Sequence, residues 1–247
     1  MKYLLWLFLL ISYSGFSQIV NIENKRLEKK EGFSGNIDLN LNFIMNTKQL
    51  LQIGDKLKVA YTKRKSHLLL ITDHSFIKSE GQDFVNRGYE HVRFNYTLKD
   101  SGRIDYEVFQ QGQFNKIQKI NLRLLLGTGF RLNLVRQKKY DMNFGTGFMG
   151  EYEELIDNGI SRDVLSSSYL SFDAQFTPSF GFNTITYFQP KLIDFGNYRL
   201  AKESYIRLKI NKYLTFKVIY SLAHDSRNIP DVRKTNYTLK NTLSFKF

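Results

Sequence analysis

The sequence predicts an all-β protein, a transmembrane antiparallel up-and-down β-barrel of about 12 strands. Three observations support this prediction: an N-terminal export segment, long stretches in which apolar and polar residues alternate, and a chain that ends on Phe247. After the export segment, no apolar stretch is long enough for a transmembrane helix. Because only alternate residues of a membrane barrel face lipid, the mean hydropathy of −0.35 is compatible with such a barrel.

Residues 1–17 predict a signal peptide. Lys2 precedes an apolar run from Leu4 to Ile11 that is too short to span a bilayer, and small and polar residues follow up to Ser17. We expect the mature chain to begin at Gln18. The sequence has no cysteine, which excludes a lipid-anchored form, disulfides and thiolate metal ligands.

The mature chain is strongly basic. Without Lys2 it has 35 basic residues, one fewer than the 36 of the whole chain, and 23 acidic residues, a net charge of +12. This surplus suggests contact with anionic surfaces. Because the protein is exported, we expect outer-membrane lipid and lipopolysaccharide as partners, and no nucleic acid. Residues 18–32 are polar and predict a periplasmic extension, and residues 33–247 predict the barrel.

Alternation is the main evidence for strands. In FSGNIDLNLNF (33–43) polar residues occupy all the even positions and apolar residues occupy the odd positions except Gly35, and similar patterns occupy 119–132, 139–152 and 235–247. A period of two sends successive side chains to opposite faces of a sheet. With weaker examples between them, the predicted strands are 33–43, 48–61, 65–77, 84–98, 103–110, 119–132, 139–152, 164–177, 180–189, 198–211, 213–222 and 235–247.

The predicted connections alternate between long and short. Such alternation is typical of outer-membrane barrels, which have long external loops, short periplasmic turns and both termini in the periplasm. The predicted external loops are 44–47, 78–83, 111–118, 153–163, 190–197 and 223–234, and the predicted turns are 62–64, 99–102, 133–138, 178–179 and about 212.

The motif GTGF occurs twice, and its glycines are Gly127, Gly129, Gly145 and Gly147. A phosphate-binding glycine loop requires a following helix. No helical pattern follows either copy, so we place the glycines on the inward row of two strands. A hairpin that pivots at Arg136 would place Gly127 opposite Gly145. The resulting dent could accept a long side chain from the opposite wall or water, or the glycines could relieve curvature of the sheet.

Two segments carry a family resemblance, LNLNFIMNT (39–47) and NLRLLLGTGFRL (121–132). The span from Phe33 to Phe247 resembles a bacterial outer-membrane β-barrel family of unknown function described as salt-induced outer-membrane proteins. Met45 departs from the family, which usually has glycine before the Asn-Thr pair, so the resemblance does not fix the turn type there. The resemblance implies a barrel in the outer membrane of a Gram-negative bacterium and supplies no catalytic residues.

Charges on the predicted inward rows would line the lumen. Seven are basic and five acidic: Asp38, Lys56, Lys58, Asp105, Glu107, Arg123, Arg131, Asp141, Glu151, Lys217, Lys240 and Lys246. About twelve strands lie between barrels filled by side chains and porins with an open lumen. Either the charges pair and close the lumen, or they line a narrow channel that favours anions.

Charge also gathers in the predicted connections. Basic residues occupy the short turns at 63–65, 136–139 and 209–212, where long side chains can reach lipid phosphates at a periplasmic rim. The predicted external loop carries Glu153, Glu154, Asp157 and Asp163 next to Glu151. These carboxylates could hold a divalent cation that bridges to lipopolysaccharide.

The sequence predicts no catalytic residue, no cofactor and no metal site. No nucleophile motif surrounds Ser166–Ser168 or any of the four histidines. We therefore expect a non-enzymatic barrel that is either a narrow channel or a closed barrel with a structural or stress role in the envelope. Two alternatives are a membrane-embedded lipid hydrolase using Ser167 and His224, and a soluble periplasmic barrel that binds an apolar ligand among inward apolar residues.

The last strand predicts assembly partners. Leu243, Phe245 and Phe247 resemble the C-terminal signal by which assembly machinery recognises barrel precursors. We therefore expect periplasmic chaperones and the barrel assembly machinery as partners, with recognition by strand pairing at an open edge. We expect the assembled barrel to be a monomer.

Overall fold

The computed structural model describes residues 31–45, 49–79, 82–98, 102–156, 159–230 and 232–246. The predicted signal peptide, residues 18–30 of the predicted extension, and Phe247 lie outside the described residues. Gly32, placed in the extension by the sequence, already belongs to the first strand. Among the described residues, no helix is long and apolar enough to cross a membrane.

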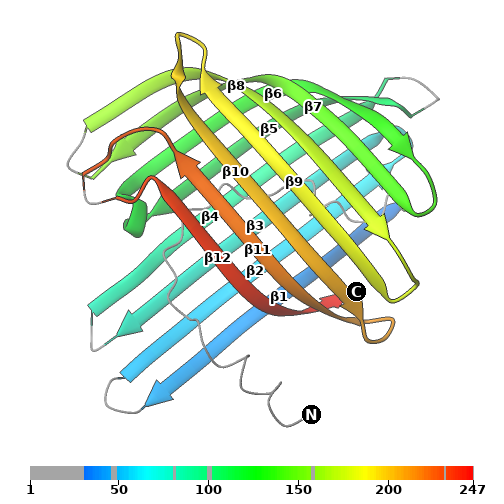
Figure 1. Cartoon of the computed structure of the whole chain (residues 1–247), viewed down its shortest axis with the longest axis horizontal. Coiled ribbons are helices and arrows are strands. Elements are labelled where there is room, and N and C mark those ends of the chain that lie inside the picture. The colour runs from blue at the N-terminus through cyan, green and yellow to red at the C-terminus, as the bar shows by residue number, and fades with distance from the viewer. Residues whose placement is uncertain are drawn as a thin grey trace.

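The chain forms a closed antiparallel barrel of twelve strands, which confirms the predicted fold class (Figure 1). Each strand pairs with its neighbours in sequence, and β12 lies next to β1. The strands are β1 (Gly32–Met45), β2 (Gln49–Lys63), β3 (Ser66–Ser79), β4 (Gln82–Thr97), β5 (Ile104–Asn115), β6 (Ile120–Arg136), β7 (Tyr140–Leu155), β8 (Gly159–Gln175), β9 (Phe180–Lys191), β10 (Asp194–Lys209), β11 (Leu214–Asp225) and β12 (Thr235–Lys246). A short 3-10 helix, η3 (Lys116–Gln118), follows β5.

We call the end of the barrel that carries the first and last strand ends the terminal end, and the opposite end the loop end. The terminal end holds Gly32, Lys246 and the connections 64–65, 98–103, 137–139, 176–179 and 210–213. The loop end holds the connections 46–48, 80–81, 116–119, 156–158, 192–193 and 226–234. The predicted alternation of long and short connections is therefore wrong, and only 226–234 is markedly long. Polar segments such as 111–115 and 159–163 continue the strands, because backbone pairing does not require apolar side chains.

The outer wall is apolar, whereas the interior is mainly polar and holds smaller apolar clusters such as Leu125, Met149 and Leu165. Leu126 on the outside is 64% exposed, whereas Asp105 and Glu153 on the inside are 2% and 0% exposed. This arrangement suits a barrel whose outer face contacts lipid. A soluble barrel that binds an apolar ligand would have its apolar row inside. The observed arrangement is the opposite, so the soluble-barrel alternative is wrong.

The register between β6 and β7 differs from the sequence prediction. Gly127 faces Met149, Gly129 faces Gly147, and Gly145 faces Arg131. The predicted pairing of Gly127 with Gly145 is wrong because the turn is centred on 137–139 rather than on Arg136. A register shift between Asn133 and Val135 also occurs near the turn.

Closure between β1 and β12 is limited. Their described residues pair at two positions, Asn36 with Lys246 and Ile37 with Phe245. The next residues of β1 pair with β2 but not with β12. The seam is therefore joined at the terminal end and is weaker than the other strand pairs.

Cysteine crosslinking tests the β6–β7 register. We expect Thr128→Cys with Phe148→Cys to form a disulfide under mild oxidation, because the two residues are direct cross-strand partners. Thr128→Cys with Phe144→Cys, the pair required by a pivot at Arg136, should remain reduced. Gel mobility with and without reductant measures both pairs. Efficient crosslinking of the second pair alone would contradict the register.

Candidate functional site

Polar and charged side chains fill the barrel interior, which makes the lumen the candidate site. Most of the predicted lumen-lining charges are buried there: Asp38, Lys58, Asp105, Glu107, Arg123, Arg131 and Glu151. Lys56, Asp141 and Lys217 are partly exposed. The side chains of Lys240 and Lys246 lie outside the described part of the protein. Burial of this many ionisable groups requires that most have partners.

Arginines from three elements converge on two carboxylates of β7 at the loop end. Nε of Arg123 on β6 donates to Glu153 at 2.5 Å. Arg199 on β10 donates through Nη2 to Glu151 at 2.9 Å and to Glu153 at 3.3 Å. Arg227, in the connection after β11, also donates to Glu153. Because β8 and β9 separate β7 from β10, the side chain of Arg199 spans the inner face of these two strands to reach its partners.

Asp225 completes this group, which we call the loop-end network: Arg123, Glu151, Glu153, Arg199, Asp225 and Arg227. Asp225 accepts hydrogen bonds from Arg227 at 2.7 Å and from Arg199 at 3.3 Å. Burial opposes the charge on Arg227, but hydrogen bonds to Asp225 and Glu153 outweigh it and raise the pKa of the guanidinium. Three arginines therefore face three carboxylates, so the network is formally neutral.

Aromatic side chains cover the GTGF glycines in the middle of the barrel. A Cβ at Gly127 would overlap the ring of Phe109 on β5, and a Cβ at Gly145 would overlap the ring of Tyr169 on β8. The predicted dent therefore exists, but rings from neighbouring strands fill it instead of side chains from the opposite wall. The hydroxyl of Tyr169 donates to Glu107 on β5 at 3.1 Å, so this ring spans β6 and β7.

The second glycine of each motif allows close backbone approach. Gly129 and Gly147 are direct partners, and a Cβ on either would overlap the backbone of the other strand. This contact favours the predicted curvature role for these two glycines.

The cavities near the aromatic side chains are very small. One of about 20 Å³ is lined by residues that include Arg93, Glu107, Tyr169 and Tyr187. Another of about 10 Å³ lies beside Asp73 and Arg87. A water molecule needs roughly 10–15 Å³ on this measure. Each cavity therefore holds about one water, which is too little for a solute.

Ion pairs also occupy the interior toward the terminal end. Arg93 contacts Glu107 at 3.2 Å, Arg131 contacts Asp105 at 3.1 Å, and Arg207 contacts Asp173 at 2.5 Å. These pairs join strands that are adjacent or one strand apart. They therefore span fewer strands than the contacts of Arg199 do.

Two interior lysines lack such partners. Among the described residues, neither Lys58 nor Lys217 has a carboxylate oxygen within the 4.0 Å of a salt bridge. Lys58 is 7% exposed and interacts electrostatically at longer range with Asp38 and Glu203. Lys56 differs, because its Nζ lies 3.3 Å from Asp73. Among the described residues, these two lysines place positive charge without a close carboxylate on β2 and β11.

The prediction of an acidic external loop at 153–163 is wrong, because β7 and β8 occupy most of this segment. Glu153 belongs to β7 and points into the loop-end network, and Asp163 belongs to β8 and contacts Lys191 at 2.7 Å. Asp157 lies outside the described residues. Among the described residues, no cluster of three or more acidic, histidine or cysteine side chains could hold a metal ion.

The structure does not bring the hydrolase candidates together. Ser167 lines the interior and accepts a hydrogen bond from Gln189 at 3.2 Å. His224 is on β11, and its Nδ1 lies 2.8 Å from the hydroxyl of Thr235. A nucleophile and its base must be within hydrogen-bond reach, so this pair does not support lipid hydrolysis.

Several central residues were absent from the sequence prediction. The alternation in YRLAKES (198–204) could have placed Arg199 inward, since it shares a row with Ala201 and Glu203. The alternation in 84–98 could have placed Arg93 inward in the same way. Arg227 gave no such signal, because it lies outside the strands and its direction depends on the path of the connection.

The closed barrel, its apolar outer wall and its charged interior define an outer-membrane β-barrel. The family described as "Protein of unknown function, DUF481" matches residues 51–247. The chain therefore belongs to this family. Comparison with curated proteins finds no match.

Solved structures with a similar fold include the translocator domain of autotransporter NalP from Neisseria meningitidis, with a TM-score of 0.50 and 7% identity over 89% of each chain. The NanC porin has a TM-score of 0.49 and 10% identity over 87% of this chain and 97% of its own. The KdgM porin has a TM-score of 0.45 and 10% identity over 87% and 99%. At these identities the similarity concerns the fold alone.

Substitution of Gly145 tests the packing of Tyr169 on the wall. We expect Gly145→Ala to destabilise the barrel by about 1–3 kcal/mol, because the new methyl group displaces the ring. Gly150→Ala on the same strand is the control, since its nearest neighbour lies 4.0 Å from the added Cβ. Urea unfolding in lipid vesicles measures both variants. Equal stability of the two would contradict the packing described.

Proposed function

We propose that the protein is a closed, non-enzymatic outer-membrane barrel that serves the envelope as a structural element and does not conduct solutes in its resting state. The observation that carries this proposal is the loop-end network, in which Arg199 on β10 reaches past β8 and β9 to Glu151 and Glu153 on β7. A neutral group of charges inside a barrel closes space without attracting a permeating ion.

The middle of the barrel supports the same proposal. Phe109 and Tyr169 cover the glycine positions that would otherwise leave space, and the cavity beside them measures about 20 Å³. A solute would have to displace these rings as well as the loop-end network. Closure is therefore built at two levels along the lumen.

The second candidate function is a narrow channel that favours anions. Its specific support is the placement of Lys58 and Lys217 in the interior without a close carboxylate among the described residues. An anion that passes Lys58 and Lys217 would still require the loop-end network to open. We therefore place the channel second.

The location and partners are part of the proposal. Cleavage after Ser17, a periplasmic extension and delivery by chaperones to the barrel assembly machinery follow from the sequence. Leu243 and Phe245 face outward on β12 and are exposed, which leaves them accessible to an assembly partner. We also propose lipopolysaccharide and lipid as neighbours of a monomeric barrel.

Planar-bilayer recordings test the closed state. We expect the wild-type barrel to give no steady openings. Arg199→Ala with Arg227→Ala should give openings that favour cations, because Glu151 and Glu153 then lose two of their three arginines. Reversal potential under a salt gradient measures the preference.

Arg162→Ala with Arg233→Ala is the matched control, since both side chains are exposed and lie outside the network. It should remain silent. Steady anion-favouring openings of the wild-type barrel would contradict the closed state and support the channel.

A further inference from the structure

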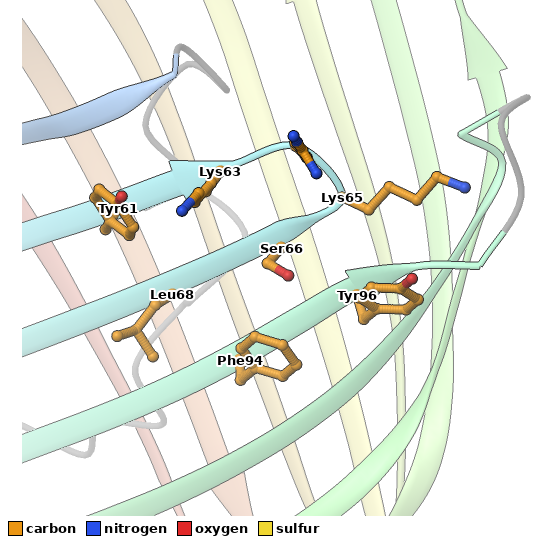
Figure 2. Close-up of a pocket in the computed structure, with 8 residues that line it drawn as sticks. Tyr61, Lys63, Lys65, Ser66, Leu68, Phe94 and Tyr96 are labelled. Atoms are coloured by element: carbon orange, nitrogen blue, oxygen red, sulfur yellow. The ribbon is translucent and has the colours of Figure 1, made fainter.

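A hollow in the outer wall lies at the terminal end of β2, β3 and β4. Its volume is about 680 Å³, and we call it the outer hollow. Figure 2 shows its lining, which comprises Tyr61, Lys63, Arg64, Lys65, Ser66, Leu68, Phe94 and Tyr96. These residues do not belong to the lumen, and none takes part in the loop-end network.

Strand pairing explains the apolar floor of the outer hollow. Tyr61 faces Leu68 across β2 and β3, and Leu68 faces Phe94 across β3 and β4. These three side chains therefore form a row on the outer face, each 37–45% exposed. The ring of Phe33 on β1 lies 4.7 Å from the ring of Tyr61 and extends the row. An apolar row of this kind suits the acyl chains of a lipid.

Positive charge borders this floor on the side of the turn. Figure 2 shows Lys63 and Lys65 at the turn, with Leu68 and Phe94 further along the strands. Arg64 has a positive φ of 52°, which places it at the tip of a tight turn. Among the described residues, the acid that contacts this turn is Glu31, which accepts the backbone N–H of Arg64 at 2.8 Å. Among the described residues, the side chains of Lys63 and Arg64 thus face one carboxylate.

Hydroxyl groups lie between the charged and apolar parts. Ser66 and Tyr96 are cross-strand partners, and both line the outer hollow. Hydroxyl donors and ammonium or guanidinium groups together suit a phosphate, which carries several acceptor oxygens. The order from charge through hydroxyl to apolar surface matches the order of groups in a phospholipid.

We propose that the outer hollow binds an anionic phospholipid of the leaflet at the terminal end, with its phosphate at Lys63 and Arg64 and its acyl chains against Leu68 and Phe94. The charge balance favours an anionic over a zwitterionic head group, since the two positive charges of Lys63 and Arg64 exceed the charge of Glu31, the acid that contacts the turn among the described residues. This inference needs membrane insertion but does not depend on whether the lumen is closed.

A second basic turn distinguishes a site from general attraction to membrane. Arg136, Lys138 and Lys139 surround the β6–β7 turn at the same end, with the same number of positive charges. None of them lines the outer hollow. General attraction of basic residues to lipid predicts equal effects at the two turns, whereas a site predicts an effect at 63–65 alone.

Native mass spectrometry of the detergent-purified barrel tests the proposal. The probes are phosphatidylglycerol and phosphatidylethanolamine with identical acyl chains. We expect the wild-type barrel to retain phosphatidylglycerol preferentially. Lys63→Gln/Arg64→Asn/Lys65→Gln should lower that retention at least about tenfold. Asparagine is chosen at 64 because it tolerates positive φ. Arg136→Gln/Lys138→Gln/Lys139→Gln should change retention less than about twofold.

Heat-dependent gel migration verifies that each variant is folded, and Phe94→Ala tests the floor separately. We expect Phe94→Ala to weaken retention of long-chain phosphatidylglycerol more than that of a short-chain analogue. Equal losses at the two turns, or equal retention of both lipids by the wild-type barrel, would overturn the proposal. Neither result depends on conductance, so the outcome is separate from that of the proposed closed state.

Discussion

A bilayer core offers no water to backbone N–H and C=O groups, so a chain that crosses it with strands must pair every strand on both sides. This constraint explains the closure of β12 onto β1 and the antiparallel order of all twelve strands. It also explains the alternation, because a strand paired on both edges can differ only between its two faces. The β1–β12 seam, where the described residues pair at two positions, meets the constraint least well.

The interior must then accommodate the charges that alternation directs inward. Arginine suits this task because its planar guanidinium can contact two carboxylates at once, as Arg199 does with Glu151 and Glu153. Such groups are costly to bury alone, and their mutual pairing offsets that cost. The aromatic rings over Gly127 and Gly145 fill the remaining space without adding charge.

The fold was largely predictable, since a period of two is a property of neighbouring residues in the sequence. The pattern therefore gave all twelve strands and the inward rows. Register was harder to predict, because the position of the β6–β7 turn and the shift near Asn133 depend on local backbone conformation. The connections were not predictable from polar composition, because β7 and β8 continue through polar residues such as Glu153 and Ser161.

The site was less predictable than the fold. Alternation shows that Glu151 points inward, but not that its partner is Arg199 on a strand three places away. Contacts of this kind depend on barrel diameter and shear, which no local pattern contains. The role of Arg227 was harder to predict, because a residue in a connection does not belong to the inward or outward row of a strand.

The proposed closed lumen depends on the contact of Arg199 on β10 with Glu151 and Glu153 on β7. A double-mutant cycle tests it most directly, with Arg199→Ala, Glu151→Ala and the double variant compared by urea unfolding in lipid vesicles. Direct contact predicts a coupling free energy of about 1–3 kcal/mol between the two residues. Single effects that add to within about 0.5 kcal/mol would show that the two side chains do not meet, and would contradict the closed lumen.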